Sequence, residues 1–574
     1  MVSNIENINN YFKLPITFSN NKYKLNETIV SDLELTETLD PSGVPLFYNA
    51  FQPKTIFGKQ IIKQYTNQYT TYIPFLKDTQ KLLKKYNKEP SNNNEFYKDV
   101  IDIWDDVKND KYFKERYHYL EWENDYCKLL NENSEFLQLL SLYHLSSPVL
   151  SFLMPIFVLI IPFFIIQMKG LKLTFDEYVN ILKVYAKNNA IGQLFTQFDS
   201  VPTDKKIYLL MSASFYVFSI YQNVLTCIKF HNNMKKIHSY FYKLKEYIKH
   251  TEENLKYLLL YTSQYKTYKQ FNTIATKHID TLTSFKNKIQ TISPYELTLQ
   301  KFSQLGKIMK HFYTIYNSSS LNDSMMWSFG FNGYIDTLEG IIDNIHKNRI
   351  SFCKLNKKNT RENVFKQSYY PALMTEKHVC NDIHLDKNLI ITGPNASGKT
   401  TILKTTLINI ILTQQMGCGF YSSGNLHPFK YIHCYLNIPD TSGRDSLFQA
   451  EARRCKDILD VIHINDKDTH FCVFDELYSG TNPEEAVQSA SLFMKYLIKF
   501  KGVHCMLTTH FYDLCKDLDE NDLFENCHMD TKEDKEKIEQ FVYTYQLKKG
   551  ISKVRGGMKV LRDMNYPTEI TNNI

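Results

Sequence analysis

A glycine-rich loop between an apolar strand and a helix is the first feature of the sequence that could perform chemistry. The stretch from Leu389 to Thr401 reads LIITGPNASGKTT and matches the pattern G-x-x-x-x-G-K-[ST]. Glycines let successive backbone N–H groups surround a polyphosphate, and the helix that follows turns its positive dipole end toward it. The pattern therefore predicts a phosphate-binding P-loop, formed by Gly393, Pro394, Asn395, Ala396, Ser397, Gly398, Lys399, Thr400 and Thr401.

Two acids about 80 positions downstream supply the rest of the chemistry of a nucleotide site. The segment THFCVFDE is an apolar strand that ends in Asp475 and Glu476, a Walker B arrangement. Lys399 would reach the β- and γ-phosphates, while Thr400 and Asp475 would hold Mg²⁺, Asp475 through water. Glu476 would polarise the water that attacks the γ-phosphate, mainly by positioning it.

Two further segments carry polar groups at the ends of expected strands and helices. The strand VHCMLTTH ends in His510, which could sense the γ-phosphate. The polar turn that begins at Pro439 and reads PDTSGRDSLFQAEARR opens a helix whose N-terminal amides could bind an anion. That anion would belong to a neighbouring subunit, because one P-loop already surrounds its own nucleotide. From the turn alone, an ordinary capped helix start is the alternative interpretation.

The elements that position these residues form a multidomain chain with α and α/β parts. Its 574 residues are enough for several domains. From about residue 351 short β-like runs alternate with helices, which is typical of an α/β domain with a mainly parallel sheet. The residues before it have helical periodicity. We expect a helical segment over 1–145, an apolar helical hairpin over 146–230, a helical arm over 231–350 and the P-loop domain over 351–574.

Charge and cysteine usage exclude several classes of protein. A net charge of +7 is mild for this length, so it permits binding to nucleic acid or anionic lipid without requiring either. The eleven cysteines include no C-x-x-C pair, which argues against a zinc site or a disulfide framework. The polar, Asn-rich N-terminus lacks the pattern of a signal peptide. We expect an intracellular protein with reduced thiols.

Two apolar segments stand out from the helical part of the chain. Val149–Met168 carries no charge and has the length needed to cross about 30 Å of hydrocarbon. Ile207–Ile228 is also uncharged but contains several polar residues. They could form a transmembrane hairpin, although lysines at both ends of each segment give no orientation. The alternative is a pair of buried core helices, and Pro155 and Pro162 predict a kink in either case.

The segment from Lys229 to about Asn348 is rich in lysine and tyrosine at helical spacing. Basic residues interleaved with aromatic ones could contact a nucleic-acid backbone. A solvated helix face with tyrosines packed beneath it would produce the same pattern. The spacing alone does not separate these interpretations.

The C-terminal motifs resemble the ATPase domain of the MutS family, the ABC-class ATPases of DNA mismatch repair. The Pro394–Asn395 pair within the P-loop is distinctive of that family, and the stretch FDELYSGTN from Phe474 resembles its Walker B motif and D-loop. The preceding Tyr-Pro and Asn-Asp-Ile, the Thr-Thr-His-Phe at 508–511 and the closing Tyr-x-Tyr-x-Leu-x-x-Gly-x-Ser from Tyr543 also match. The resemblance covers about 351–574 specifically.

The resemblance implies an ATP hydrolase that uses ATP and Mg²⁺ and works as a homodimer, or as a heterodimer with another MutS-like chain. Each ATP site would be completed by the partner's signature loop, and alignment on Phe448 and Glu451 gives Ser446 the role of the serine acting in trans. His378 falls where the family stacks a ring on adenine. ATP binding would be coupled to movement of the long helices.

Two departures from the family leave the output of the ATPase open. The mismatch-reading motif Gly-x-Phe-x-Glu is absent, because Phe113-Lys-Glu115 lacks the glycine. The apolar segment Val149–Met168 has no counterpart in the soluble repair proteins and is similar to a group of MutS-like ATPases with membrane spans. One hypothesis is binding to duplex DNA in a mismatch-repair or recombination-like role. The other is a membrane-anchored ATPase whose substrate is not a mismatch.

Overall fold

The structure is a computed structural model that describes most of the chain. The described residues are 4–88, 94–108, 125–170, 173–188, 198–200, 202–292, 302–357, 362–436, 446–533, 541–552 and isolated positions between and after these ranges. They divide into two compact units. Unit 1 comprises residues 1–98, 251–279 and 323–574, and unit 2 comprises 99–250 and 280–322. Each unit is assembled from separate stretches of chain, whereas the sequence suggested four consecutive ones.

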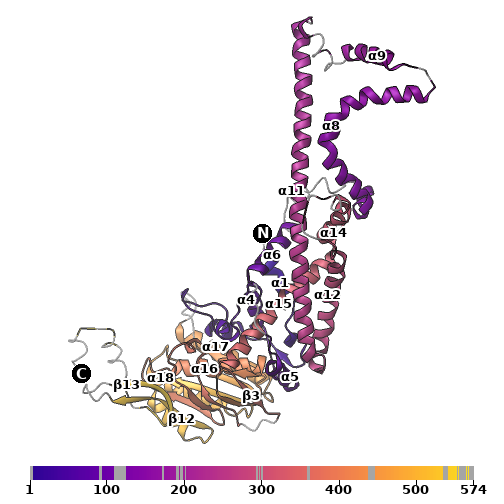
Figure 1. Cartoon of the computed structure of the whole chain (residues 1–574). Coiled ribbons are helices and arrows are strands. Elements are labelled where there is room, and N and C mark those ends of the chain that lie inside the picture. Colours follow the sequence, from indigo (N-terminus) through magenta and orange to yellow (C-terminus); the bar gives the residue numbers. More distant parts are fainter. Residues whose placement is uncertain are drawn as a thin grey trace. The chain divides into compact units, whose positions relative to one another are not determined.

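Long helices dominate the first 350 residues, and strands alternate with helices after them (Figure 1). The helices are α1 (Asn4–Tyr11), α2 (Glu27–Asp32), α3 (Leu46–Phe51), α4 (Ile56–Tyr65), α5 (Ile73–Lys85), α6 (Asn94–Lys108), α8 (Ser134–Met168), α9 (Phe175–Asn188), α11 (Thr203–Thr262), α12 (Lys269–Lys288), α14 (Leu305–Asn317), α15 (Ser319–His346), α16 (Lys399–Met416), α17 (Leu447–Ile464), α18 (Pro483–Leu497) and α19 (Tyr512–Asp519). The strands are β1 (Lys22–Tyr23), β2 (Tyr69–Thr70), β3 (Ser351–Leu355), β4 (Val364–Ser368), β5 (Asn381–His384), β6 (Asn388–Thr392), β7 (Cys418–Gly419), β8 (Ser423–Leu426), β9 (Tyr431–Tyr435), β10 (His470–Asp475), β11 (Val503–Thr509), β12 (Phe524–Glu533) and β13 (Phe541–Lys549).

The main sheet of unit 1 has the order β13-β12-β6-β11-β10-β9. Every neighbouring pair in it is parallel except β12 with β13. In this register Thr392 lies opposite Thr509, and Asp475 lies opposite Thr508. The carboxyl ends of β6, β11 and β10 therefore meet at one edge, as the sequence predicted for a mainly parallel sheet. A second, five-stranded sheet with mostly antiparallel pairs, β5-β4-β8-β3-β7, was not anticipated.

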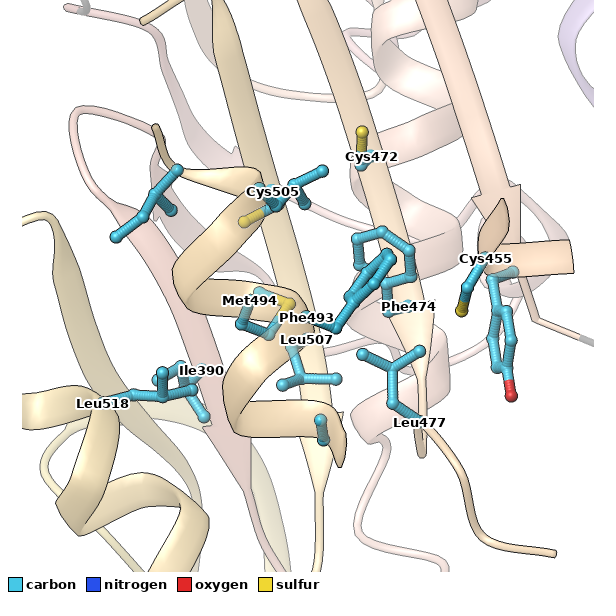
Figure 2. Packing of buried hydrophobic residues seen from close by; sticks show 14 of the residues in the cluster. Ile390, Cys455, Cys472, Phe474, Leu477, Phe493, Met494, Cys505, Leu507 and Leu518 are labelled. Atoms are coloured by element: carbon cyan, nitrogen blue, oxygen red, sulfur yellow. The ribbon is translucent and has the colours of Figure 1, made fainter. Parts of the chain in front are cut away.

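Apolar side chains from β10 and β11 form a core with the helices that cover one face of this sheet (Figure 2). Phe474 and Leu507 point from the strands toward Phe493 and Met494 of α18. These strands are buried along almost their whole length, which explains why they read as continuous apolar runs rather than alternating ones. Only their last residues reach the polar edge.

The N-terminal helices pack closely against α15 within unit 1. A Cβ atom on Gly333 would lie 2.5 Å from the carbonyl oxygen of Phe57, and one on Gly340 would lie 1.7 Å from that of Phe51. Any side chain at these positions would push the helices apart, so the glycines permit the close approach. Asp336 of the same helix accepts hydrogen bonds from the backbone N–H groups of Lys54 and Thr55.

The C-terminal end of α16 is held by the same N-terminal segment. Gln80 of α5 donates to the carbonyl oxygens of Cys353 and Gly417, at 2.7 and 2.6 Å. Gln415, itself buried, donates to the carbonyl oxygen of Tyr65 at 2.6 Å. Gly417 ends the helix with a φ of +75°, a conformation that glycine adopts without strain. The helix that begins at the P-loop is thus hydrogen-bonded at its far end to α5 and to the turn after α4.

Unit 2 contains the two apolar segments found in the sequence. Val149–Met168 is the second part of α8, and Ile207–Ile228 is the first part of α11. Figure 1 shows α8 bending along its length, as the prolines at 155 and 162 predict. Many large apolar side chains of both segments are exposed in the described residues, so the interpretation as buried core helices is wrong. Among the described residues, the helical stretch long and apolar enough to cross a membrane is Ser134–Met154, further toward the N-terminus than the sequence suggested.

Candidate functional site

The glycine-rich loop joins buried strand β6 to helix α16 at the carboxyl edge of the main sheet. Gly398 has a φ of +95°, and Ala396 has a φ of +62°, so the chain passes twice through the left-handed region before the helix begins. Alternation of this kind turns consecutive backbone N–H groups toward one point and forms an anion-binding concavity. The first turn of α16 follows directly, with its dipole aligned toward the same point.

Lys399 lies folded over the loop and is only 6% exposed. Its Nζ donates to the carbonyl oxygens of Gly393 and Pro394 at 3.1 and 3.3 Å and lies 3.8 Å from Oε1 of Glu476. Burial lowers the pKa of the amine, while Glu476 and Asp475 oppose that shift. A buried cation beside the glycine-rich loop is well placed to neutralise an incoming anion.

Asp475 links three elements at the sheet edge. The Thr400 hydroxyl donates to Oδ2 of Asp475 at 2.7 Å, and the Thr508 hydroxyl donates to its Oδ1. Burial raises the pKa of Asp475, although both hydroxyl bonds lower it. From the sequence, Thr508 was recognised only as part of the motif at 508–511. Its contact with the Asp475 carboxylate follows from the β10–β11 register.

Glu476 and His510 are directly paired. Nε2 of His510 lies 2.5 Å from Oε1 of Glu476, and this contact is the main reason that the pKa of Glu476 is lowered. Glu476 has a φ of +53°, which is unusual for a residue other than glycine, and its backbone N–H bonds to Thr508 at 3.1 Å. In this backbone conformation, which is sparsely populated by residues other than glycine, Oε1 of Glu476 lies 3.8 Å from Nζ of Lys399.

A cavity of about 610 Å³ opens over the loop. Residues 395–402, Glu476 and His378 all line it, so the structure brings the predicted adenine-side residue and the P-loop together. The ring of His378 stacks on Tyr369 with centroids 4.1 Å apart. Tyr545 lines the same cavity, near Gly398. The volume and the mixed aromatic and polar lining suit a mononucleotide.

The closing strand β13 folds back over the loop. The Tyr543 hydroxyl donates to the carbonyl oxygen of Asn395 at 2.9 Å. Asn381 holds the strand by donating to the carbonyl oxygen of Tyr545 and accepting from the N–H of Leu547. The sequence marked these residues as a motif but did not place them at the site, since their approach depends on the pairing of β12 with β6.

Two features of the loop fit a polyphosphate. Ser397 is 1% exposed, and its hydroxyl has no hydrogen-bond partner among the described residues. A Cβ atom on Gly393 would lie 2.7 Å from that hydroxyl, so only glycine leaves the space open. A buried hydroxyl without a partner is costly unless a ligand satisfies it. The Thr400 hydroxyl and the Asp475 carboxylate are adjacent oxygen ligands of the kind that Mg²⁺ prefers.

Ser446 lies apart from this cavity. It is exposed and caps α17, its hydroxyl accepting from the N–H of Gln449 while the Gln449 side chain accepts from its N–H. The rest of the signature turn, residues 437–445, lies outside the described residues. Glu451 of the same helix is 2% exposed and binds the turn after Glu476, accepting from the Ser479 hydroxyl and the Gly480 N–H. This contact, missed from sequence, ties α17 to β10.

The parallel sheet, the glycine-rich loop and the acids at its edge define a P-loop domain of the α/β class. Residues 389–574 match the family model of MutS domain V. This C-terminal domain of the chain therefore belongs to the MutS family.

Curated relatives agree with this assignment. The chain is 30% identical over 220 residues to MutS protein homolog 4 of Mus musculus, covering 36% of this chain and 22% of that protein. It is 32% identical over 172 residues to endonuclease MutS2 of Caldicellulosiruptor saccharolyticus, covering 29% and 22%. It is 28% identical over 200 residues to the DNA mismatch repair protein MutS of Fusobacterium nucleatum, covering 34% and 21%. The matches thus span about a fifth of the length of these relatives.

Proposed function

We propose that the chain is a MutS-type ATPase that binds ATP and Mg²⁺ at the P-loop, hydrolyses ATP and couples hydrolysis to DNA binding. The observation that carries this proposal is the convergence of Lys399, Thr400, Asp475 and Glu476 at one sheet edge beside the cavity. Bound Mg·ATP supplies the phosphoryl group that is cleaved and the cation that neutralises its charge.

Each side chain has a separate task in this proposal. Thr400 and Asp475 hold Mg²⁺, and Lys399 leaves its carbonyl partners to contact the phosphates. Glu476 orients the attacking water; its lowered pKa keeps it ionised near neutral pH, and therefore a hydrogen-bond acceptor. His510 fixes the direction of that carboxylate by pairing with it. His378 and Tyr545 flank the base.

We further propose that two subunits complete each site, either as a homodimer or as a heterodimer. Ser446 is exposed at the N-terminus of α17 and is absent from the lining of its own cavity, which supports action on the nucleotide of a second subunit. A mixture of Lys399→Ala and Ser446→Ala chains tests this. If the sites are composite, each mixed dimer has one intact site, so the mixture regains part of the turnover.

DNA binding is supported by the names of the relatives and by a basic face of unit 2. Lys307, Lys310 and His311 lie on one side of α14 at spacings of three and four residues. The pKa of His311 is lowered mainly by burial and further by the positive charges of Lys310, Lys288 and Lys307. The three lysines therefore lie near His311. A cluster of cations on two helices suits a phosphodiester backbone.

The test is ATP turnover and DNA binding by the purified chain. We expect Mg²⁺-dependent hydrolysis and salt-dependent affinity for duplex, junction or mismatched DNA. Replacing Lys288, Lys307 and Lys310 by Gln should lower the slope of log affinity against log salt by about 2 to 3. Lys347→Gln, which removes a lysine that is already paired with Asp343, is the control. Absence of nucleotide binding would reject the proposal, and equal affinity in the triple variant would reject its DNA surface.

A further inference from the structure

Unit 2 presents an unusually large set of exposed apolar side chains on two helices. We call this set the apolar surface. On α8 it comprises Val149, Leu150, Phe152, Met154, Phe157, Ile160, Ile161, Phe164, Ile165 and Met168. On α11 it comprises Ile207, Tyr208, Leu210, Met211, Phe215, Val217, Phe218, Tyr221, Val224 and Ile228. Their exposed fractions range from 39% for Phe157 and Val224 to 87% for Met168. Exposed apolar surface on this scale marks an interaction site.

The apolar surface lies on chain without charge. No Asp, Glu, Lys or Arg occurs from Phe136 to Met168 or from Ile207 to Ile228. At about 1.5 Å per residue, the second stretch is about 33 Å long as a helix, comparable with a hydrocarbon thickness of about 30 Å. Among the described residues, Ser134–Met154 of α8 is the stretch that also has the hydropathy of a membrane span. Only uncharged polar side chains, Ser214, Ser219 and Gln222, interrupt the exposed part of α11.

Polarity inside the helix pair is the reverse of that in a water-soluble helix. The Tyr216 hydroxyl donates to the backbone carbonyl of Ser151 at 3.0 Å, and the Asn223 amide donates to the Ser151 hydroxyl at 2.5 Å. Cys227 donates to the carbonyl oxygen of Leu145 at 3.6 Å. These three polar groups of α11 thus face α8, while most of its exposed side chains are apolar. A helix in water instead turns its polar face to the solvent. Helices in lipid satisfy polar groups against one another in this way.

Cations lie at the ends of the charge-free stretches. Lys169 follows the stretch in α8, Lys205 and Lys206 precede the one in α11, and Lys229 follows it. Lysines at such positions can extend their ammonium groups to lipid headgroups while their methylene chains remain in apolar surroundings. Anionic headgroups would attract them further.

We propose that the apolar surface inserts into the hydrocarbon of a lipid bilayer and attaches unit 2 to a membrane. A second copy of the chain is the less suitable occupant. The exposed apolar positions extend around more than half of the circumference of each helix, more than one docked helix would cover. Lipid covers every direction at once, and the inward hydrogen bonds leave no buried polar group of Tyr216 or Asn223 unpaired. This inference does not depend on the ATPase or DNA proposal.

Flotation of the full chain with vesicles of phosphatidylcholine and phosphatidylserine tests the proposal. We expect the chain to float with the vesicles and to stay with them through a high-salt and alkaline carbonate wash, which removes proteins held only by charge. Replacing Val217 and Phe218 by Glu should reduce the bound fraction at least about tenfold, because a charge in hydrocarbon is costly. A Phe218→Trp chain should lose indole fluorescence to acyl-brominated lipid.

The matched control is the pair Ile464→Glu and Leu492→Glu, which changes two exposed apolar residues of α17 and α18 in unit 1. It should float like the unchanged chain. Release of the unchanged chain by the carbonate wash would overturn the proposal, as would an unquenched Phe218→Trp signal. So would a lipid-free oligomer that the Val217 and Phe218 substitutions dissociate, because a second copy would then cover the surface. Secondary structure by circular dichroism excludes unfolding of the charged variant.

Discussion

The Thr400 hydroxyl donates to Oδ2 of Asp475 at 2.7 Å, although 75 residues separate the two in the chain. This bond joins the first turn of the P-loop helix to the last residue of β10. It forms because β6 and β10 both end at the same edge, on either side of β11. The Thr400 hydroxyl and the Asp475 carboxylate, two potential Mg²⁺ ligands, therefore lie together next to the buried Lys399.

Replacing Lys399 with Ala should weaken ATP binding by about 100-fold or more, because a buried charge-assisted contact is lost. Titration with a fluorescent ATP analogue measures the change. Lys404→Ala, on the same helix but outside the residues lining the cavity, is the control and should bind as before. Unchanged affinity in Lys399→Ala would show that the nucleotide binds elsewhere.

Glu476→Ala should leave ATP binding intact and lower turnover by about 10²–10³-fold, because the water would lose its oriented acceptor. ATP should remain trapped on the protein, which filter binding of radiolabelled nucleotide would detect. His510→Ala should have a smaller effect, since it removes only the partner that holds Glu476. Normal turnover in Glu476→Ala would remove this residue from the mechanism.

Thr508→Val should raise the Mg²⁺ concentration required for half-maximal turnover by about tenfold, because Asp475 loses a hydrogen bond that holds its carboxylate in place. The Mg²⁺ dependence of hydrolysis at saturating ATP measures this. Thr509→Val is the matched control, as its hydroxyl accepts from the N–H of Phe511 instead. An equal shift in both variants would indicate general damage to β11.

The stability of unit 1 should fall as the pH rises from about 4.5 to about 7. Burial, aided by the nearby Asp336, raises the pKa of Glu339 from 4.5 to about 7, so the folded state binds more protons than the unfolded state in this window. Glu339→Gln should remove up to about 3 kcal/mol of that dependence. Melting temperatures between pH 5 and 8 test the sign, and a parallel pH profile in the variant would contradict it.

Gly417→Ala should destabilise the protein by about 1–3 kcal/mol. Its φ is +75°, and the added Cβ atom would lie 2.6 Å from Cγ of Gln80. Gly170→Ala separates the two causes, because Gly170 has a φ of +78° with nothing within 4 Å of the added atom. Denaturant unfolding should show a greater loss at Gly417. Equal losses would mean that backbone strain alone accounts for the effect.

Local patterns in the sequence were sufficient to predict much of the C-terminal domain. The loop at 393–401 and the acids at 475 and 476 can be recognised from neighbouring residues alone. The conformation of a P-loop depends on its own backbone, and the two acids directly follow an apolar run. The match to MutS domain V confirms the family to which these motifs pointed. The mainly parallel sheet was predicted for the same reason, from the alternation of strands and helices.

Pairing across long distances in the chain was decided only by the tertiary structure. Three contacts depend on which strands are neighbours: His510 with Glu476, Thr508 with Asp475, and Tyr543 with Asn395. The sequence of a strand does not indicate which other strand it pairs with. The same is true of the apolar helices. Their composition was consistent with either a buried core or a membrane, and only the fold revealed which faces of α8 and α11 are exposed.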